Sequence, residues 1–339
     1  MRAPLLALLL LALPLSAQAQ TPEEFYRGRT ITLAIGYAPG GGYDTYARLF
    51  ARYFGRHVPG RPTVATQNVP GAGSLKLAND IVNTAPRDGT IVAAIGREQV
   101  TAPLFGIPGT HFDPATMDWL GNLDQASSLC VVWHTVPVTS MQDLKSREMV
   151  VGATGPASTT TLLPLALKEE LGYRLKVISG YPGGNDVNLA LERGEVEGRC
   201  VWSYASIMST HPDWLRDGKI RILAATSLKR LPELPDVPTV LELAPNQRAG
   251  QILQLFVAGD AMARPFLAPP GLPPARLAAL RDAFMATARD PDFLAEAKKQ
   301  HLELDPMDWR AMSEAVAGLY RTPPDVVKAA MAIIEHAGK

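Results

Sequence analysis

The sequence predicts an α/β protein with two lobes, each built on an open, mostly parallel sheet flanked by helices. Three observations support this prediction. Strand-like and helical patterns alternate from residue 30 to residue 95, the alternation starts again near residue 130, and 339 residues suffice for about two domains. We therefore expect two similar halves in series, with boundaries near residues 122 and 226.

The first half contains three strand-like runs, at residues 30–35, 63–69 and 90–95. A helix is expected after the first run, because apolar and aromatic side chains recur three or four positions apart from Tyr46 to Phe54 and form one stripe. A second helix is expected over residues 75–82, where the apolar residues also share one face.

The second half contains five strand-like runs, at residues 130–133, 149–153, 176–180, 198–202 and 221–225. Helical patterns cover residues 162–171 and 186–193, and the second of them stops at Gly194, a favoured residue just after a helix. Prolines between residues 232 and 245 indicate an extended connector.

The last part of the chain is helical, at about residues 275–288, 291–300, 306–320 and 324–336. No strand pattern remains there to build a third domain. These helices are therefore expected to pack back on the first lobe.

Residues 1–19 are expected to be a secretory signal peptide. Arg2 gives a short basic start, residues 5–15 are almost wholly apolar, and Ala17-Gln18-Ala19 has the small-x-small cleavage pattern. A membrane anchor is the alternative, but the apolar run is shorter than the ~20 residues of a span. We expect a mature protein that is soluble outside the cytoplasm, in the periplasm if the source is a Gram-negative bacterium.

Composition excludes several classes of protein. Lys and Arg number 33 and so do Asp and Glu, so no basic excess points to nucleic acid and no acidic excess points to disorder. The two cysteines, Cys130 and Cys200, are too few for a disulfide scaffold or a thiolate zinc site. Export would permit a disulfide between them, and the alternative is two small buried hydrophobic residues. The sequence leaves these two alternatives open.

Four turns share one design, in which a strand end leads into a helix start. The residues expected to contact a ligand are Tyr37, Ala38, Gly40, Gly41, Gly42 and Asp44 in the first turn, Ala72, Gly73 and Ser74 in the second, Thr154, Ser158 and Thr159 in the third, and Asn185 and Asp186 in the fourth. Unpaired backbone N–H groups and the positive end of the helix dipole point outward at such turns. They suit a carboxylate or a phosphate without needing Arg or Lys.

Two lobes would place two pairs of these turns face to face across a cleft, beyond the strand ends. The alternative for each turn is a plain helix cap, since Ser, Thr and Asp are ordinary N-cap residues. The role of Asp44 is left open in the same way. Its side chain is either an N-cap or a carboxylate that is presented to an ammonium, a hydroxyl or a water on the ligand. Four such turns together favour a binding site.

Signatures of enzymes are absent from the sequence. Residues 40–45 do not have the dinucleotide-binding spacing, and no Gly-rich turn is followed by a phosphate-binding lysine. Zinc-protease and nucleophile-elbow motifs are missing as well. The six histidines are scattered, and each is expected on the surface or in the core rather than at a metal. We expect no cofactor and no metal.

Residues 31–49 and 68–90, which include the first two Gly-rich turns, resemble the solute-binding receptors of tripartite tricarboxylate transporters, the TctC or Bug-type family. Residues 220–243 and 268–284 look similar to further parts of that family. The resemblance implies a periplasmic binding protein of the type II fold, with lobe one at residues 20–122 plus 227–339 and lobe two at residues 123–226.

By this resemblance, the lobes close on a small organic anion, usually a carboxylate. Backbone amides of the first two turns and hydroxyls of the third would hold its carboxylate ends, often through water. The chain departs from the family pattern at Ser74, Lys76 and Leu77 and at Asn185-Asp186. Asp186 would repel a second acid group on the ligand if it faced the cleft, which counts against di- and tricarboxylates.

The resulting hypothesis is a monomeric transport receptor that delivers its ligand to the membrane permease subunits of a tripartite transporter. A ligand-sensing adaptor that docks on a sensor kinase is an alternative that the sequence does not separate from it. An exported hydrolase is a third alternative, but it needs a nucleophile–base pair that is not found.

Overall fold

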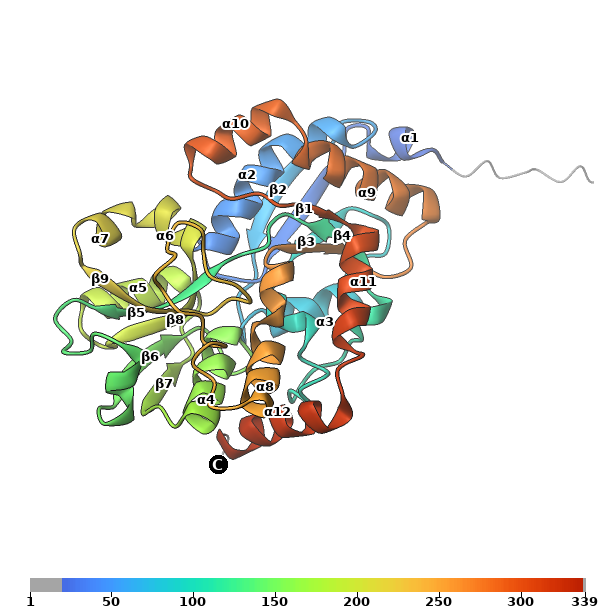
Figure 1. The fold of residues 1–339 in the computed structure, drawn as a ribbon. Coiled ribbons are helices and arrows are strands. Elements are labelled where there is room, and N and C mark those ends of the chain that lie inside the picture. Colours follow the sequence, from blue (N-terminus) through green and yellow to red (C-terminus); the bar gives the residue numbers. More distant parts are fainter. Residues whose placement is uncertain (1–19, 338–339) are drawn as a thin grey trace, which may run out of the picture.

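The computed structural model describes residues 20–337, and it confirms the predicted two-lobed α/β fold (Figure 1). The expected signal peptide at residues 1–19 lies outside the described residues. Two separate sheets form, and each takes most of its strands from one half of the chain. Helices pack against both sheets.

The first sheet has the strand order β11-β4-β10-β3-β1-β2. Its strands are β1 (Thr30–Ile35), β2 (Thr63–Asn68), β3 (Ile91–Ala94), β4 (Asp118–Asn122), β10 (Pro265–Ala268) and β11 (Met307–Asp308). The pairs β1–β2 and β1–β3 are parallel. Alternate residues of β1, namely Ile31, Leu33 and Ile35, are buried in one cluster with the apolar face of the helix that follows.

The second sheet has the strand order β7-β6-β8-β5-β9. Its strands are β5 (Ser128–Trp133), β6 (Met149–Ala153), β7 (Leu175–Ser179), β8 (Gly198–Ser203) and β9 (Ile220–Ala225). Strand β6 pairs in parallel with β7 and β8, and β5 runs antiparallel to β8 and β9. The five strands expected in this half are therefore all present.

Both sheets are mixed, which the sequence did not predict. Each sheet contains one strand that is antiparallel to both of its neighbours. In the first sheet β10 is antiparallel to β3 and β4, and in the second β5 is antiparallel to β8 and β9. These are the strands by which the chain enters one lobe from the other. Strand β5 follows β4 after five residues, at 123–127, so the chain passes directly from the first sheet to the second.

The helices flank the sheets in two groups. The helices around the first sheet are α1 (Pro22–Tyr26), α2 (Gly42–His57), α3 (Leu75–Asn83), α9 (Pro274–Ala288), α10 (Pro291–Lys299) and α11 (Trp309–Leu319). The helices around the second sheet are α4 (Thr159–Leu171), α5 (Gly184–Glu192), α6 (Tyr204–Thr210) and α7 (Pro212–Arg216). The remaining two, α8 (Gln247–Val257) and α12 (Pro324–Ala337), pack against α4.

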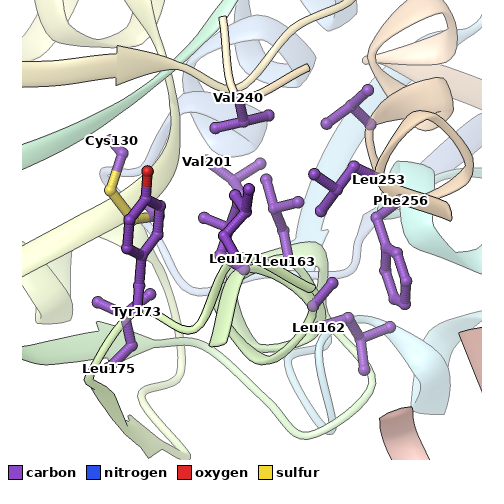
Figure 2. Packing of buried hydrophobic residues seen from close by; sticks show 14 of the residues in the cluster. Cys130, Leu162, Leu163, Leu171, Tyr173, Leu175, Val201, Val240, Leu253 and Phe256 are labelled. Atoms are coloured by element: carbon purple, nitrogen blue, oxygen red, sulfur yellow. A yellow bond between two sulfur atoms is a disulfide. The ribbon is translucent and has the colours of Figure 1, made fainter. Parts of the chain in front are cut away.

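Helix α12 departs in part from the expectation that the C-terminal helices pack on the first lobe, because it contacts α4 of the second lobe as well as α8, which lies in the segment expected to belong to the first. Helix α4 is apolar around most of its circumference, so it needs cover on the side away from its own sheet. Helices α8 and α12 supply that cover, and Figure 2 shows Leu253 and Phe256 of α8 beside Leu162 and Leu163 of α4. A single apolar cluster thus ties the end of the chain to the second sheet.

The structure joins Cys130 of β5 to Cys200 of β8 by a disulfide, across 70 residues of sequence. The two strands are antiparallel neighbours at the centre of the second sheet. Both cysteines are completely buried, and Cys130 belongs to the apolar cluster around α4 (Figure 2). The bond therefore lies where reagents in solution reach it only when the sheet opens.

Replacing both cysteines, as Cys130→Ala with Cys200→Ala, should lower the free energy of unfolding by about 4 kcal/mol, because the bond restrains a long loop in the unfolded chain. Denaturant unfolding of both proteins, followed by tryptophan fluorescence, measures the difference. Alkylation of the unfolded wild type should find no free thiol. Two free thiols, or equal unfolding midpoints, would contradict this assignment.

Candidate functional site

The four turns identified in the sequence come together between the two sheets. In the first turn, the Ala38 N–H donates to the Pro182 carbonyl of the fourth turn, at 3.3 Å. A Cβ atom built on Gly41 would lie 3.5 Å from the Gly184 nitrogen. In the second turn, a Cβ atom on Gly73 would lie 2.8 Å from Cβ of Ser158 in the third. The lobes are thus in direct contact. A side chain at Gly73 would clash with Ser158, whereas a Cβ atom at Gly41 would be at an ordinary contact distance.

A small cavity, open to solvent at its mouth, lies between these contacts. Of the residues expected to contact a ligand, those that line this cavity are Tyr37, Gly41, Gly42, Thr154 and Thr159. Gly41 is the N-cap of α2 and Thr159 begins α4, so the N-terminal ends of two helices reach the cavity. Their unpaired N–H groups favour an anion.

Asp44 does not line the cavity, and it is not the N-cap of α2. Its carboxylate accepts hydrogen bonds from the Gly40 N–H at 2.9 Å and the Asn68 amide at 2.8 Å, and it pairs with Arg48 at 2.8 Å. Burial opposes ionisation, but these partners outweigh it and lower the pKa of Asp44. The side chain therefore holds the shape of the first turn and has no oxygen left for a ligand.

The second turn also serves the contact between lobes rather than the cavity wall. Ser74 is fully buried, and its hydroxyl accepts from the Gly96 N–H at 3.0 Å. The carbonyl of Gly73 accepts from the Gln99 amide at 2.8 Å. Ala72 lies against Gly155 of the third turn. The departure from the family pattern at Ser74 thus affects the packing of the turns and not the lining of the cavity.

The remaining expected residues lie beside the cavity. The Ser158 hydroxyl hydrogen-bonds Thr160 at 2.6 Å, which orders the first turn of α4. Asn185 packs against Gly40, and Asp186 is half-buried in the first turn of α5 beside Gly183. None of these three side chains lines the cavity. The expected repulsion between Asp186 and a ligand therefore does not arise there.

Four charged residues that the sequence reasoning did not single out do line the cavity, namely Arg97, Glu98, Arg199 and Arg264. All four are buried. The turns alone were expected to suit an anion without Arg or Lys, and the structure places three arginines at the same cavity. The sequence contains an indication of one of them. Arg199 lies inside the strand-like run from Gly198 to Trp202, and charged side chains are rarely buried unless they are paired.

Two of these arginines have partners within the protein. Arg97 forms a buried ion pair with Asp260 at 2.6 Å and donates to the Ser128 hydroxyl at 3.1 Å. Arg264 donates to the Ser206 hydroxyl at 3.1 Å, and its guanidinium lies over the rings of Tyr43 and Tyr46. Since Ser206 belongs to α6 and Arg264 immediately precedes β10 of the first sheet, this contact also joins the lobes.

Arg199 has no acidic partner among residues 20–337. Its side chain is held by Nη1, which donates to the Gly184 carbonyl at 3.0 Å and to Asn188 at 2.7 Å, and it stacks on Trp202 at 4.5 Å. Nε has no partner, and no hydrogen bond of Nη2 is present. Burial lowers the pKa of Arg199 to about 9, so it remains charged at neutral pH.

The free Nε–Nη2 edge is the edge with which a guanidinium binds a carboxylate through two parallel hydrogen bonds. A buried guanidinium without an anion is costly, because it has lost water without gaining a counter-charge. Arg199 is only 8% exposed and lines the cavity. The cavity is therefore lined by a guanidinium that has no counter-charge among the described residues.

Metal binding finds no support in the described part of the chain. Nowhere in residues 20–337 do three His, Cys, Asp or Glu side chains gather in a way that could hold a metal ion. The same residues include no helix with the length and apolar character needed to cross a membrane.

A family model described as tripartite tricarboxylate transporter family receptor, TctC, matches residues 56–335. Among curated proteins, the UPF0065 protein in the gbd 5′ region of Cupriavidus necator is 29% identical over 344 residues, which cover 98% of this chain and 93% of that protein. A UPF0065 protein of Bordetella pertussis is 24% identical and covers 83% of each chain.

Solved structures share the fold. Periplasmic binding protein BugD aligns with a TM-score of 0.73 and 22% identity, over 92% of this chain and 99% of that one. R. palustris Rpa4515 with adipate gives a TM-score of 0.70 and 25% identity, over 89% and 97%. MatC (Rpa3494) from Rhodopseudomonas palustris, with bound malate, gives 0.68 and 20%, over 90% and 99%.

Gly155→Ala should block the approach of the lobes, because its Cβ atom would collide with the backbone of Ala72 and Gly73 across the cleft. We expect ligand affinity to fall about tenfold or more, which corresponds to about 1.4 kcal/mol. In small-angle X-ray scattering, the Gly155→Ala protein should have a larger radius of gyration than the wild type.

The matched control is Gly250→Ala on α8, where a Cβ atom meets only Ala244 at 3.8 Å. This variant should leave both the ligand affinity and the radius of gyration unchanged. A Gly155→Ala protein as compact and as tightly binding as the wild type would refute the contact between the second and third turns.

Proposed function

This chain belongs to the tripartite tricarboxylate transporter receptor family, and from that premise we propose that it captures a small carboxylate between its lobes and presents it to the membrane subunits of such a transporter. As a member of this receptor family it is a solute-binding protein and not an enzyme. The observation that carries the choice of a carboxylate is the free edge of the buried Arg199 guanidinium.

The surroundings of Arg199 support an anion. Amides at the start of α2, at Gly41 and Gly42, and hydroxyls of Thr154 and Thr159 line the same cavity. Two helix N-termini add positive potential from opposite lobes. A carboxylate bound between them would contact both lobes at once, and so it would favour the closed arrangement over an open one.

Relatives support a small organic acid as well. The structures of Rpa4515 and MatC contain adipate and malate, respectively. Both are small carboxylates. We extend to this chain only the class of ligand, because its cavity carries charges of its own.

We further propose that residues 1–19 direct export and are removed, so that the mature protein works in the periplasm. The lobes would then be residues 20–122 plus 227–339 and residues 123–226. Closure would present surfaces from both lobes to the membrane subunits. A monomer suffices for this mechanism, because both halves of the cavity come from one chain.

Arg199→Met should weaken carboxylate binding about a hundredfold, since two charge-assisted hydrogen bonds of about 1.5 kcal/mol each are lost. Titration calorimetry against a panel of small mono-, di- and tricarboxylates measures the change. The melting temperature of the free protein should stay the same or rise, because the variant removes a buried charge that has no partner.

The contrasting variant is Arg97→Met, which leaves Asp260 buried and unpaired. That change should lower the free energy of unfolding by about 3–5 kcal/mol. Unaltered carboxylate affinity in Arg199→Met would contradict the proposed anchor, and the absence of any bound carboxylate in the wild type would contradict the proposed function.

A further inference from the structure

Strand β8 contains a β-bulge directly after Arg199. Two residues of β8, Cys200 and Val201, lie opposite one residue of β5, Cys130, while the residues on either side of them pair one to one. The strand lies at the centre of the second sheet, and both Arg199 and Val201 line the cavity. Bulges are frequent next to binding sites, where they redirect a side chain. The position of this bulge therefore points to a role in the site.

Val201 has a backbone conformation that valine rarely adopts. Its φ angle of 59° lies in the left-handed region, which a β-branched side chain disfavours. Of the residues that the structure describes, Val201 is the only β-branched one with a positive φ. Such a conformation persists only where the surrounding structure enforces it. The bulge must therefore be restrained by something other than the preference of its own residues.

The bulge determines which side chains of β8 share a face. Side chains alternate along a regular strand, so two residues three positions apart lie on opposite faces. In the structure, Arg199 and Trp202 are both on the face covered by α5, where Arg199 donates to Asn188 of that helix and Trp202 joins the apolar cluster. Cys200 and Val201 both belong to the cluster around α4 on the other face, where Figure 2 shows Val201. The extra residue thus brings Arg199 and Trp202 together.

This shared face fixes the orientation of the guanidinium. The central carbon of the Arg199 guanidinium lies 4.5 Å from the centre of the Trp202 ring, so the indole covers one side of its plane. Gly184 and Asn188 accept from Nη1 at one end. Together these contacts leave the Nε–Nη2 edge at the cavity. Because Arg199 and Trp202 flank the bulge, a change in its backbone would turn one relative to the other.

The disulfide supplies a restraint at this place. It links Cys200, the first residue of the bulge, to Cys130, the single residue opposite. A covalent link between the two strands keeps their register fixed beside Val201, and so it opposes a return to a regular ladder. The strained residue and the bond that restrains it are therefore adjacent in the same bulge.

We propose that the bulge at Cys200 and Val201, held by the disulfide to Cys130, is a positioning device for the anion-binding edge of Arg199. This inference rests on the proposed function, in which that edge binds the ligand carboxylate. Val201 is a positioning residue, because it acts through the two side chains that flank the bulge. The disulfide then has a role in binding as well as in stability.

The opposition between Val201 and the disulfide makes the proposal testable. Glycine adopts a positive φ readily, so Val201→Gly would keep the bulge without any restraint. Removing the disulfide, as Cys130→Ala with Cys200→Ala, should therefore disturb the site in the otherwise native chain but not in the background of Val201→Gly. A disulfide that only stabilised the fold would have the same effect in both backgrounds.

The first measurement needs no ligand. Protein labelled with 5-fluorotryptophan has five fluorine resonances, and Trp202→Phe identifies that of Trp202. Its chemical shift should respond to the guanidinium stacked on the ring. We expect the resonance to move when the disulfide is removed from the otherwise native chain. In the background of Val201→Gly, removal of the disulfide should leave it in place.

The second measurement is titration calorimetry of the same proteins with small mono-, di- and tricarboxylates, well below their melting temperatures. Removal of the disulfide should weaken binding at least about fivefold in the otherwise native chain, because the apparent affinity scales with the fraction of molecules in which the site is assembled. In the background of Val201→Gly the same removal should leave the affinity unchanged. The matched control is Leu253→Ala of α8, which removes packing from the same apolar cluster. It should lower the melting temperature without altering the Trp202 resonance or the affinity.

Equal effects of disulfide removal in the two backgrounds, or no effect in either, would overturn the proposal while carboxylate binding by the wild type upheld the proposed function. A wild type that binds no carboxylate would overturn both, even if the Trp202 resonance moved as expected. If the protein without the disulfide does not fold, recovery of folding by Val201→Gly supports the restraint, because that change otherwise only removes a buried side chain. Failure to recover would count against it.

Discussion

A guanidinium that has lost its water needs an anion, and the described chain provides none for Arg199. The surrounding structure holds this charge in place without neutralising it. Gly184 and Asn188 accept from Nη1, Trp202 covers one face of the group, and the opposite edge remains free. A protein that only had to fold would be more stable with an apolar side chain at this position. The arrangement is explained if an external carboxylate completes it.

The close approach of the two lobes depends on the same region. Gly184 leaves room for Arg199, since a Cβ atom there would lie 2.6 Å from Nη2. Gly73 and Gly155 let the second and third turns touch through their backbones. Arg264, immediately before β10 of the first sheet, donates to Ser206 of α6. In the proposed function, closure and ligand contact would use neighbouring residues, so that a bound anion would stabilise the closed form directly.

Much of the fold could be predicted from the sequence, because it depends on local patterns. The alternation of strands with amphipathic helices and the glycines at strand ends are both local signals, and they placed the four turns correctly at the ends of strands. Strand direction is not local, so the antiparallel β5 and β10 were not foreseen. Helix α12 packs on α4 because α4 is apolar on two sides, a feature that the sequence of residues 159–171 already contains.

The candidate site was predicted less completely, for a related reason. Turn residues such as Tyr37 and Thr154 could be found because each follows its own strand. Arg97, Arg199 and Arg264 are far apart in sequence, and only the folded chain brings them to one cavity. Asp44 was ambiguous because its partners, Asn68 and the Gly40 amide, are also set by the fold.

The most direct test of the account is a crystal structure of the protein with its ligand bound. The account predicts a closed cavity in which both oxygens of one ligand carboxylate lie about 3 Å from Nε and Nη2 of Arg199. A ligand held only by backbone amides, with water on that edge of Arg199, would contradict it.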